Sequence, residues 1–501
     1  MRLFLYILVI SLSTSLFAQD DVKETRKKEK DPEEAREAKE KLMKEQMAKV
    51  EAEAEKGNRA AILEVGNNYF GGRGGVEQDL KKAIYWYQKG ADLNSRQCQF
   101  NLAGCYVRGT GVKQDVEKAL ELYMIAADFG LKEANINAAL ILDSLRRYDK
   151  ARLYFNKAAG LNDARAVKKL AHYYEHGLGG EQKHEVAAQL YLKLAKNGDA
   201  LSQLKIADYL NQGQGVKQDF KESMRWLTLA AGNENPEAQA KLAYCYMNGL
   251  GVKKDSETGY KWYLRSANLN FAPAQLAIGN CYALGRAVPY DPVKAFHWYS
   301  KAAKMKNRQA IYNMGVAYAT GSGTGKNEKL ALESYKKAAD MGYSEAMYTL
   351  GILHLSGEMV KKDGQTAVIW FQKAAKANHP EATRQLGMCF FTGNGVSKSI
   401  PVGVSMLKKA ALMGNTTAMV NLGQLFSDPT YANKNDKEAF NWYEKAAAAK
   451  DPEGSYHLGR AYLHGKGTAK NEKYSLMLLK EAAHFGHESA RKLLIELRDK
   501  K

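Results

Sequence analysis

Residues 240–270 read AKLAYCYMNGLGVKKDSETGYKWYLRSANLN, and close copies of this stretch fill most of the chain. The stretch contains two apolar segments separated by a glycine loop, GLGV, at residues 249–252. In both segments the apolar residues recur at three- and four-residue spacing, which is typical of a helix with one buried face. Each copy therefore predicts a pair of helices joined by a tight loop.

One small residue, which we call the landmark, marks the same place in every copy and follows an apolar residue, as in Leu242-Ala243. All eight intervals from Ala171 to Gly459 are 36 residues long. The third copy lacks the glycine loop, and SDPTYANKN (427–435) replaces the glycines in the eleventh. The landmarks are Gly66, Ala103, Ala139, Ala171, Ala207, Ala243, Gly279, Gly315, Gly351, Gly387, Gly423 and Gly459.

A helix pair of this size cannot bury its own apolar face, so neighbouring pairs must stack. The predicted fold class is an all-α, α/α superhelical solenoid of about twelve 36-residue helix-pair repeats with N- and C-terminal capping helices. An Asp after the loop is placed to cap the second helix, and Pro292 is predicted to occupy its first position in one repeat. These aspartates are Asp79, Asp115, Asp219, Asp255, Asp291 and Asp363.

All six tryptophans fall at one position of the second helix, which indicates packing between helices. They are Trp86, Trp226, Trp262, Trp298, Trp370 and Trp442.

Five segments are predicted along the chain. Residues 1–18 are predicted to be a signal peptide, because one early cation precedes an apolar run too short to span a membrane and Ala18 fits a cleavage site. Residues 19–31 are predicted to be a disordered linker, 32–57 an N-terminal capping helix, 58–486 the repeats and 487–501 a C-terminal capping helix. We therefore expect an exported protein, periplasmic or secreted, with no membrane-spanning segment.

The formal net charge is +19, and the part from Gly57 onward carries +20 because residues 1–56 are nearly balanced. A surplus of this size favours anionic partners, such as acidic protein surfaces or anionic envelope glycans. The lysines alternate with acidic residues and form no basic block, so the charge can equally serve solubility. No nucleic-acid partner is expected.

Residues 240–270 and MYTLGILHLSGEMVKKDGQTAVIWFQKAAKAN (347–378) resemble the Sel-one-like repeat, a relative of the tetratricopeptide repeat. The resemblance covers residues 58–486. It implies an α/α superhelix that serves as a scaffold for protein interactions. A secreted cysteine-rich branch of the family is reported to bind or weakly hydrolyse penicillin, and this branch supplies an enzymatic alternative.

The cysteines and serines argue against that alternative. Cys105, Cys245, Cys281 and Cys389 share one position of the first helix, and neighbours one repeat apart lie too far from each other for a disulfide. No intrachain disulfide is predicted. The SxxK pattern occurs at Ser334–Lys337 and Ser405–Lys408, but the chain has no partner SDN or KTG motif. The sequence therefore predicts no catalytic residue and no cofactor.

Two other motifs are candidate ligand sites. GSGTGK (321–326) lacks the glycine and the Ser or Thr that a phosphate-binding loop requires, so it is interpreted as an ordinary repeat loop. His172 and His176 are spaced i, i+4, with His184 nearby and Glu175 the only adjacent carboxylate, which could hold zinc. Scattered solvent-facing histidines are the favoured interpretation, and no metal site is predicted.

By analogy with tetratricopeptide repeats, the residue after each landmark faces the concave groove, where a peptide or partner helix would bind. These candidates differ freely between repeats, which fits either a recognition surface or unconstrained exposed positions. The leading hypothesis is a protein-binding scaffold; the alternatives are a penicillin-binding or weakly hydrolytic protein and a binder of anionic envelope polymer. The predicted partner-binding residues are Asn67, His172, Asp208, Tyr244, Asn280, Met388, Gln424 and Arg460.

Overall fold

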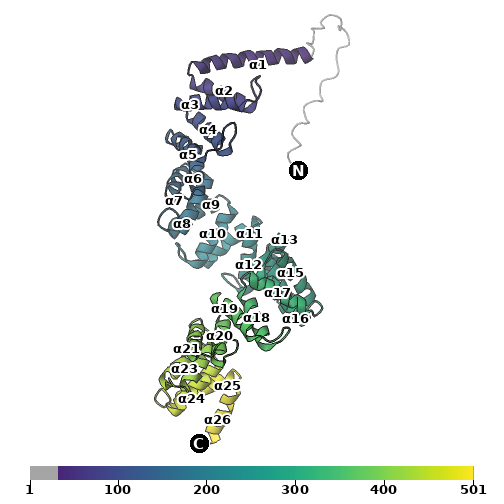
Figure 1. Cartoon of the computed structure of the whole chain (residues 1–501), viewed down its shortest axis with the longest axis vertical. Helices are drawn as coiled ribbons and strands as arrows, with labels where there is room; N and C mark the ends of the chain where they lie inside the picture. The colour runs from purple at the N-terminus through teal and green to yellow at the C-terminus, as the bar shows by residue number, and fades with distance from the viewer. Residues whose placement is uncertain (1–31, 500–501) are drawn as a thin grey trace. The chain divides into compact units, whose positions relative to one another are not determined.

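The computed structural model describes residues 32–499, and every helix or strand assigned among them is an α-helix (Figure 1). The predicted signal peptide (1–18) and linker (19–31) lie outside the described residues. Helices α2 to α25 form twelve consecutive pairs, with one further helix at each end. The predicted fold class, an α/α solenoid of helix-pair repeats, is confirmed.

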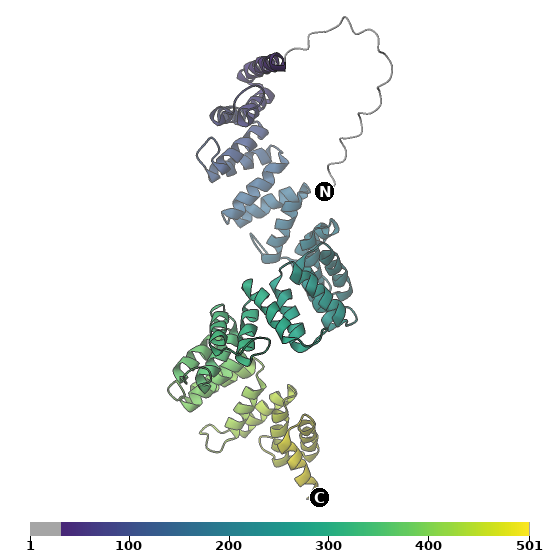
Figure 2. The ribbon, with the colours of Figure 1, turned by 90° about the vertical axis from the view of Figure 1, so that its right-hand side faces the viewer.

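The described chain divides into two compact units, each built from repeats that pack on their neighbours (Figure 2). The first unit holds residues 32–198 and 213–217. Its helices are α1 (Pro32–Glu55), α2 (Arg59–Gly71), α3 (Leu80–Asp92), α4 (Arg96–Arg108), α5 (Val116–Asp128), α6 (Lys132–Ser144), α7 (Tyr148–Gly160), α8 (Ala164–His176) and α9 (His184–Lys196).

The second unit holds residues 199–212 and 218–499. Its first helices, which carry the landmarks, are α10 (Ala200–Gln212), α12 (Pro236–Asn248), α14 (Ala272–Leu284), α16 (Arg308–Thr320), α18 (Ser344–Ser356), α20 (Pro380–Thr392), α22 (Thr416–Ser427) and α24 (Pro452–His464). Its second helices are α11 (Phe220–Gly232), α13 (Ser256–Asn268), α15 (Pro292–Lys304), α17 (Glu328–Asp340), α19 (Gly364–Lys376), α21 (Ile400–Leu412), α23 (Asp436–Ala448) and α25 (Glu472–His484), and α26 (Glu488–Asp499) follows.

The aspartates predicted to start the second helices do so. In α15, for example, the Asp291 carboxylate accepts a hydrogen bond of 2.9 Å from the backbone N–H of Lys294, and Pro292 is the first helical residue. Such a cap satisfies one of the N–H groups that have no partner within the helix. The same bond is made by Asp79, Asp115, Asp219, Asp255 and Asp363.

The glycine landmarks leave room for a side chain of the second helix, which in most of these repeats is an aromatic ring. A Cβ atom added to Gly351 would lie 2.5 Å from the ring of Phe371, which is fully buried. A Cβ atom added to Gly279 would lie at the same distance from the ring of Tyr299. This packing joins the two helices of these repeats, and it requires the landmark to be small.

The loops pack on the neighbouring repeat. In GSGTG (321–325), Gly323 has φ +74°, and an added Cβ would collide with the backbone carbonyl of Pro292, where the second helix of the previous repeat begins. The glycine therefore serves both a left-handed backbone and a contact between repeats. The third repeat dispenses with this arrangement, since only residues 145–147 connect α6 to α7.

A helix lies against the repeats at each end of the described chain. In α1, Met47 and Ala54 are buried against Ile62 and Val65 of the first repeat. In α26, Ala490 is buried against Leu479 and Ala482 of the last second helix. Both helices run over the segments that were predicted to cap the stack.

The tryptophans fill the gaps between helices, as expected from their shared position. Trp86 and Trp442 are buried, and the other four are half-buried. Trp86, for example, belongs to the apolar cluster that contains Ile62 and Leu102 of the neighbouring first helices.

Candidate functional site

All eight predicted partner-binding residues lie on first helices, but their environments differ. Five of them are exposed: Asn67, His172, Tyr244, Gln424 and Arg460. The other three are half-buried: Asp208, Asn280 and Met388. The structure brings Asp208 and Tyr244 to one hollow and Gln424 and Arg460 to another, and it distributes the rest over separate repeats.

Several of these residues also bind the next repeat, which the sequence did not reveal. The residue two positions before a landmark contacts the residue one position after the preceding landmark, some 33 or 34 residues earlier. The Lys241 ammonium, for example, donates to both carboxylate oxygens of Asp208, at 2.9 and 2.7 Å. The corresponding pairs are Asn101–Asn67, Asn313–Asn280, Asn421–Met388 and His457–Gln424.

Two of the predicted residues are tied to their own repeat as well. The Tyr87 hydroxyl donates to Oδ1 of Asn67 at 2.8 Å, and the Tyr299 hydroxyl donates to Oδ1 of Asn280 at 2.9 Å. The side-chain carbonyl of each asparagine therefore accepts a hydrogen bond that joins the two helices of its repeat, which is a structural role. Tyr244 differs from them, because 55% of its surface is exposed on α12.

Tyr244 lines the hollow that best fits a ligand site. This hollow has a volume of about 530 Å³ and extends over the successive first helices α10 and α12 to the start of α14. Its wall combines apolar side chains, Leu227, Leu250 and Phe271, with polar ones. Concave sites that mix apolar walls with a few polar groups are typical of ligand binding.

The polar side of this hollow is an ion-pair network. Burial lowers the pKa of the Lys241 ammonium, but hydrogen bonds to Asp208 and Glu237 outweigh that effect and raise the pKa above its ordinary value. Lys241 is therefore a permanent cation between two carboxylates, at 2.7 Å from Asp208 and 3.0 Å from Glu237. The site offers both signs of charge beside an apolar wall.

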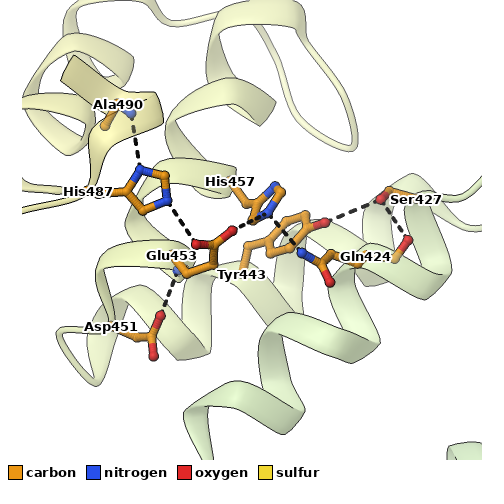
Figure 3. Close-up of polar contacts among 9 residues, drawn as sticks. Gln424, Ser427, Tyr443, Asp451, Glu453, His457, His487 and Ala490 are labelled. Atoms are coloured by element: carbon orange, nitrogen blue, oxygen red, sulfur yellow. Dashed lines mark hydrogen bonds and ion pairs between the residues drawn. The ribbon is translucent and has the colours of Figure 1, made fainter. Parts of the chain in front are cut away.

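A second hollow lies near the C-terminus, with a volume of about 160 Å³ and with Gln424 and Arg460 in its wall. Figure 3 shows that His457 and His487 both point toward the Glu453 carboxylate, at 3.2 and 2.9 Å. On its other side, His457 contacts Gln424 at 3.2 Å and stacks on the ring of Tyr443. The chain of contacts links the first helices α22 and α24 to His487, the residue before α26.

Acidification is expected to destabilise these last repeats. Burial lowers the pKa of His457, and the nearby Glu453 opposes this only in part while Arg460 and His487 reinforce it. The folded chain therefore binds this proton more weakly than the unfolded chain, so stability is complete above about pH 6.5 and falls as the pH drops below it toward the folded pKa. Hydrogen exchange of α24 and α26 at pH 7.5 and 5.5 measures the effect.

His457→Gln should reduce this pH dependence, whereas His297→Gln, a change on the exposed face of α15, should leave it unchanged. Equal pH dependence in wild type and His457→Gln would contradict the assignment to His457. His464, whose pKa burial also lowers, would then be the group to test.

In each SxxK motif one residue has a partner outside the motif. The Ser334 hydroxyl donates to the Leu330 carbonyl of its own helix at 2.8 Å, and Lys408 pairs with Glu438 at 3.1 Å. All five cysteines are free thiols, four of them buried, and burial raises the pKa of each. A buried thiol with a raised pKa is a weak nucleophile.

The three histidines weighed as metal ligands do not meet. The His184 ring contacts the Gln214 amide at 2.9 Å, whereas His172 and His176 lie together on α8, with ring centres 4.2 Å apart. Glu175 is the group that joins this pair, with a carboxylate oxygen 4.0 Å from His172 and 3.8 Å from His176.

Among residues 32–499, none of the helices is both long and apolar enough to cross a membrane.

Comparison with protein families finds the Sel1 repeat in twelve segments of the chain. These are residues 59–95, 96–130, 143–163, 164–199, 200–235, 236–271, 272–307, 308–343, 344–379, 380–415, 416–451 and 452–487. The matches span both units. No curated protein matches the chain.

Several solved structures are similar to the chain. The protective antigen c5321 of uropathogenic Escherichia coli, which displays an SLR fold, is 25% identical over 91% of this chain and 90% of that one, with a TM-score of 0.51. A Sel1 repeat protein of Oxalobacter formigenes is 26% identical over 62% of this chain and 89% of that one, with a TM-score of 0.46. Cysteine-rich protein B of Helicobacter pylori is 25% identical over 26% of this chain and 92% of that one, with a TM-score of 0.22.

Proposed function

Because the chain belongs to the Sel1 repeat family, we propose that it is an exported scaffold that binds a partner protein or peptide along the first helices of its repeats. Proteins built from Sel1 and related tetratricopeptide-like repeats generally mediate protein–protein interactions. The observation that supports a site in this chain is the hollow beside Tyr244, because it combines exposure, an apolar wall and fixed charges.

The residues of this hollow favour a peptide with an apolar anchor. Leu250 and Phe271 can cover an apolar side chain, while the carboxylates around Lys241 can receive the peptide's backbone or a basic side chain. Tyr244 supplies a large amphipathic surface with few rotatable bonds, which is the character of residues that dominate binding energy. An extended segment or a partner helix can contact α10 and α12 together.

Tyr244→Ala is expected to weaken partner binding by about 2 kcal/mol or more, the loss typical of a dominant interface residue. The partner is first captured by a photo-crosslinking amino acid placed at position 244 of the full chain, and its affinity for both variants is then measured by calorimetry. The matched control carries the same crosslinker at Ile369, which is 51% exposed on the second helix α19.

Crosslinks from position 244 and none from position 369 would support the proposal. Crosslinks confined to position 369 would instead place the partner on the second helices. Unchanged affinity of Tyr244→Ala for a captured partner would exclude the hollow as its binding site.

A second candidate function, binding of an anionic polymer, is favoured by how charge divides between the two helix sets. From α13 to α21, the five second helices carry twelve basic and four acidic residues, a net charge of +8, whereas the first helices between them carry two of each sign. Six consecutive second helices also present one exposed cation each at the same position, a set we call the cationic stripe. It consists of Arg265, Lys301, Lys337, Lys373, Lys409 and Lys445.

Four cations of the cationic stripe, Arg265, Lys301, Lys373 and Lys445, lie over the ring of a tryptophan on the same helix. Lys301 lies 4.2 Å from the ring centre of Trp298, and Lys373 lies 4.2 Å from that of Trp370. None of the six cations pairs with a carboxylate among residues 32–499. An extended polyanion would therefore find one cation per repeat.

Heparin, a sulfated glycan, is a suitable probe of the cationic stripe. Lys301→Glu with Lys373→Glu should weaken its binding more than Lys361→Glu with Lys398→Glu, which changes the net charge equally in exposed loops. Equal weakening by both pairs would show a response to net charge alone.

Export rests on residues 1–18, which precede the described part of the chain. A fusion of the full chain to a reporter active only outside the cytoplasm tests it, with Gln19 expected as the new N-terminus.

Sel1 repeat scaffolds are typically non-catalytic. Nitrocefin turnover that survives purification of the full chain would favour the penicillin-hydrolysing alternative instead.

A further inference from the structure

We propose that His172, Glu175 and His176 on α8 form a binding site for a divalent transition-metal ion of the zinc class. Each of these residues offers one ligand atom, and the three atoms lie within 4.8 Å of one another. All three residues belong to the first helix of the fourth repeat. The site goes beyond the proposed protein-binding function, and it stands on different residues from those around Tyr244.

The helix itself places the three ligands together. Residues spaced i, i+3 and i+4 share one face of an α-helix, so their side chains project in the same direction. His172 and His176 are exposed, and their ring centres lie 4.2 Å apart. Closing from this arrangement to the 2.0–2.2 Å bonds that zinc makes requires rotation of the two exposed histidine side chains toward the half-buried carboxylate of Glu175.

The ring of His176 is oriented in the form that a metal needs. Its Nδ1 lies 3.0 Å from the backbone carbonyl of His172, and a carbonyl can only accept, so Nδ1 carries the proton. The lone pair of the neutral ring is then on Nε2, which can bind the ion. A ring N–H held by a backbone carbonyl is the usual support of a metal-binding histidine.

The carboxylate is also held from outside. The Tyr191 hydroxyl on α9 donates to Oε2 of Glu175 at 2.7 Å, and Glu175 is half-buried. This bond limits the side-chain rotations of the carboxylate and holds it near the two imidazoles. The site thus has two imidazoles, one carboxylate and an orienting hydroxyl.

The other histidine cluster lacks this potential. At the C-terminus the His487 ring uses both nitrogens, since Nδ1 accepts from the Ala490 backbone N–H at 3.1 Å and Nε2 contacts Glu453 at 2.9 Å. A metal there would have to displace a helix cap. The α8 site requires no such loss at His176.

Two imidazoles and a carboxylate determine the class of ion. Imidazole ligands suit zinc, copper and nickel, whereas calcium and magnesium prefer oxygen alone. Three protein ligands leave a coordination position for water or for a side chain of another molecule. His172 follows the landmark Ala171, just as Tyr244 follows the landmark of its own repeat. An ion bound here would therefore lie on the corresponding face of the first helix.

Calorimetric titration of the untagged full chain with Zn²⁺ at pH 7.5 tests the site, and the visible spectrum of the Co²⁺-loaded chain reports its ligands. Wild type is expected to bind one ion at this site. His172→Ala and His176→Ala should each weaken binding by at least about tenfold, the loss that even residues outside the first coordination sphere can cause. Glu175→Gln should weaken it less than either, and His297→Ala, an exposed histidine of α15, should not change it.

Far-ultraviolet circular dichroism of each variant separates a lost ligand from a lost fold. Zn²⁺ binding that is unchanged in the His172→Ala, His176→Ala double variant would overturn the proposal. The proposal would also be overturned if His172→Ala and His176→Ala weakened Zn²⁺ binding no more than the control His297→Ala does.

Discussion

Phe371→Ala is expected to destabilise the second unit by about 3–5 kcal/mol, the cost of removing a large aromatic side chain from a packed core. Phe371 is fully buried, and its ring packs on the landmark Gly351 of the same repeat and within a cluster that contains Leu386 and Cys389 of the next. Its loss would leave a cavity at both interfaces at once. Because each repeat is stabilised by its neighbours, the damage should spread beyond α18 and α19.

Urea unfolding of the full chain measures this loss, and hydrogen exchange locates it. Ile369→Ala is the matched control, because Ile369 lies two residues away on the same helix with half of its surface exposed. We expect it to change the stability by no more than about 0.5 kcal/mol. Similar losses for the two variants would contradict the assignment of Phe371 to the core.

Gly323→Ala is expected to cost about 1–3 kcal/mol, from backbone strain and from collision with the previous repeat. Gly323 has φ +74°, and an added methyl group would meet the carbonyl of Pro292. Ala287 and Met359 take positive φ at the same place in neighbouring loops. The position can therefore hold a side chain in other repeats, which limits the expected loss.

The control for this change is in the same loop. Gly325 has no neighbouring atom within 4 Å of the place where a Cβ would lie, and its φ is not positive. Gly325→Ala should therefore leave the unfolding midpoint nearly unchanged. If both alanine variants unfolded alike, the contact between Gly323 and the previous repeat would not contribute to stability.

The candidate site was predicted only in part. The positions after the landmarks were placed on first helices, and Tyr244 is exposed there, as the groove interpretation requires. Asn67 and Asn280, however, were predicted on equal terms with Tyr244, although second-helix tyrosines bind both of them. The sequence signal for contacts at these positions was a polar residue two positions before the next landmark. Such a residue looks like any exposed polar residue until its partner in the neighbouring repeat is known.

The sequence by itself determined the helices and their order, because helix periodicity, aspartate caps and glycine loops act within a few residues of one another. It also determined that the repeats stack, because a single pair cannot bury its apolar face. The tertiary structure alone decided which polar groups remain exposed, since the bonds that occupy them join residues such as Lys241 and Asp208, 33 positions apart. It alone decided the hollow beside Tyr244, whose walls come from three successive repeats. Those contacts depend on how helices approach one another in space, and no short stretch of sequence contains that information.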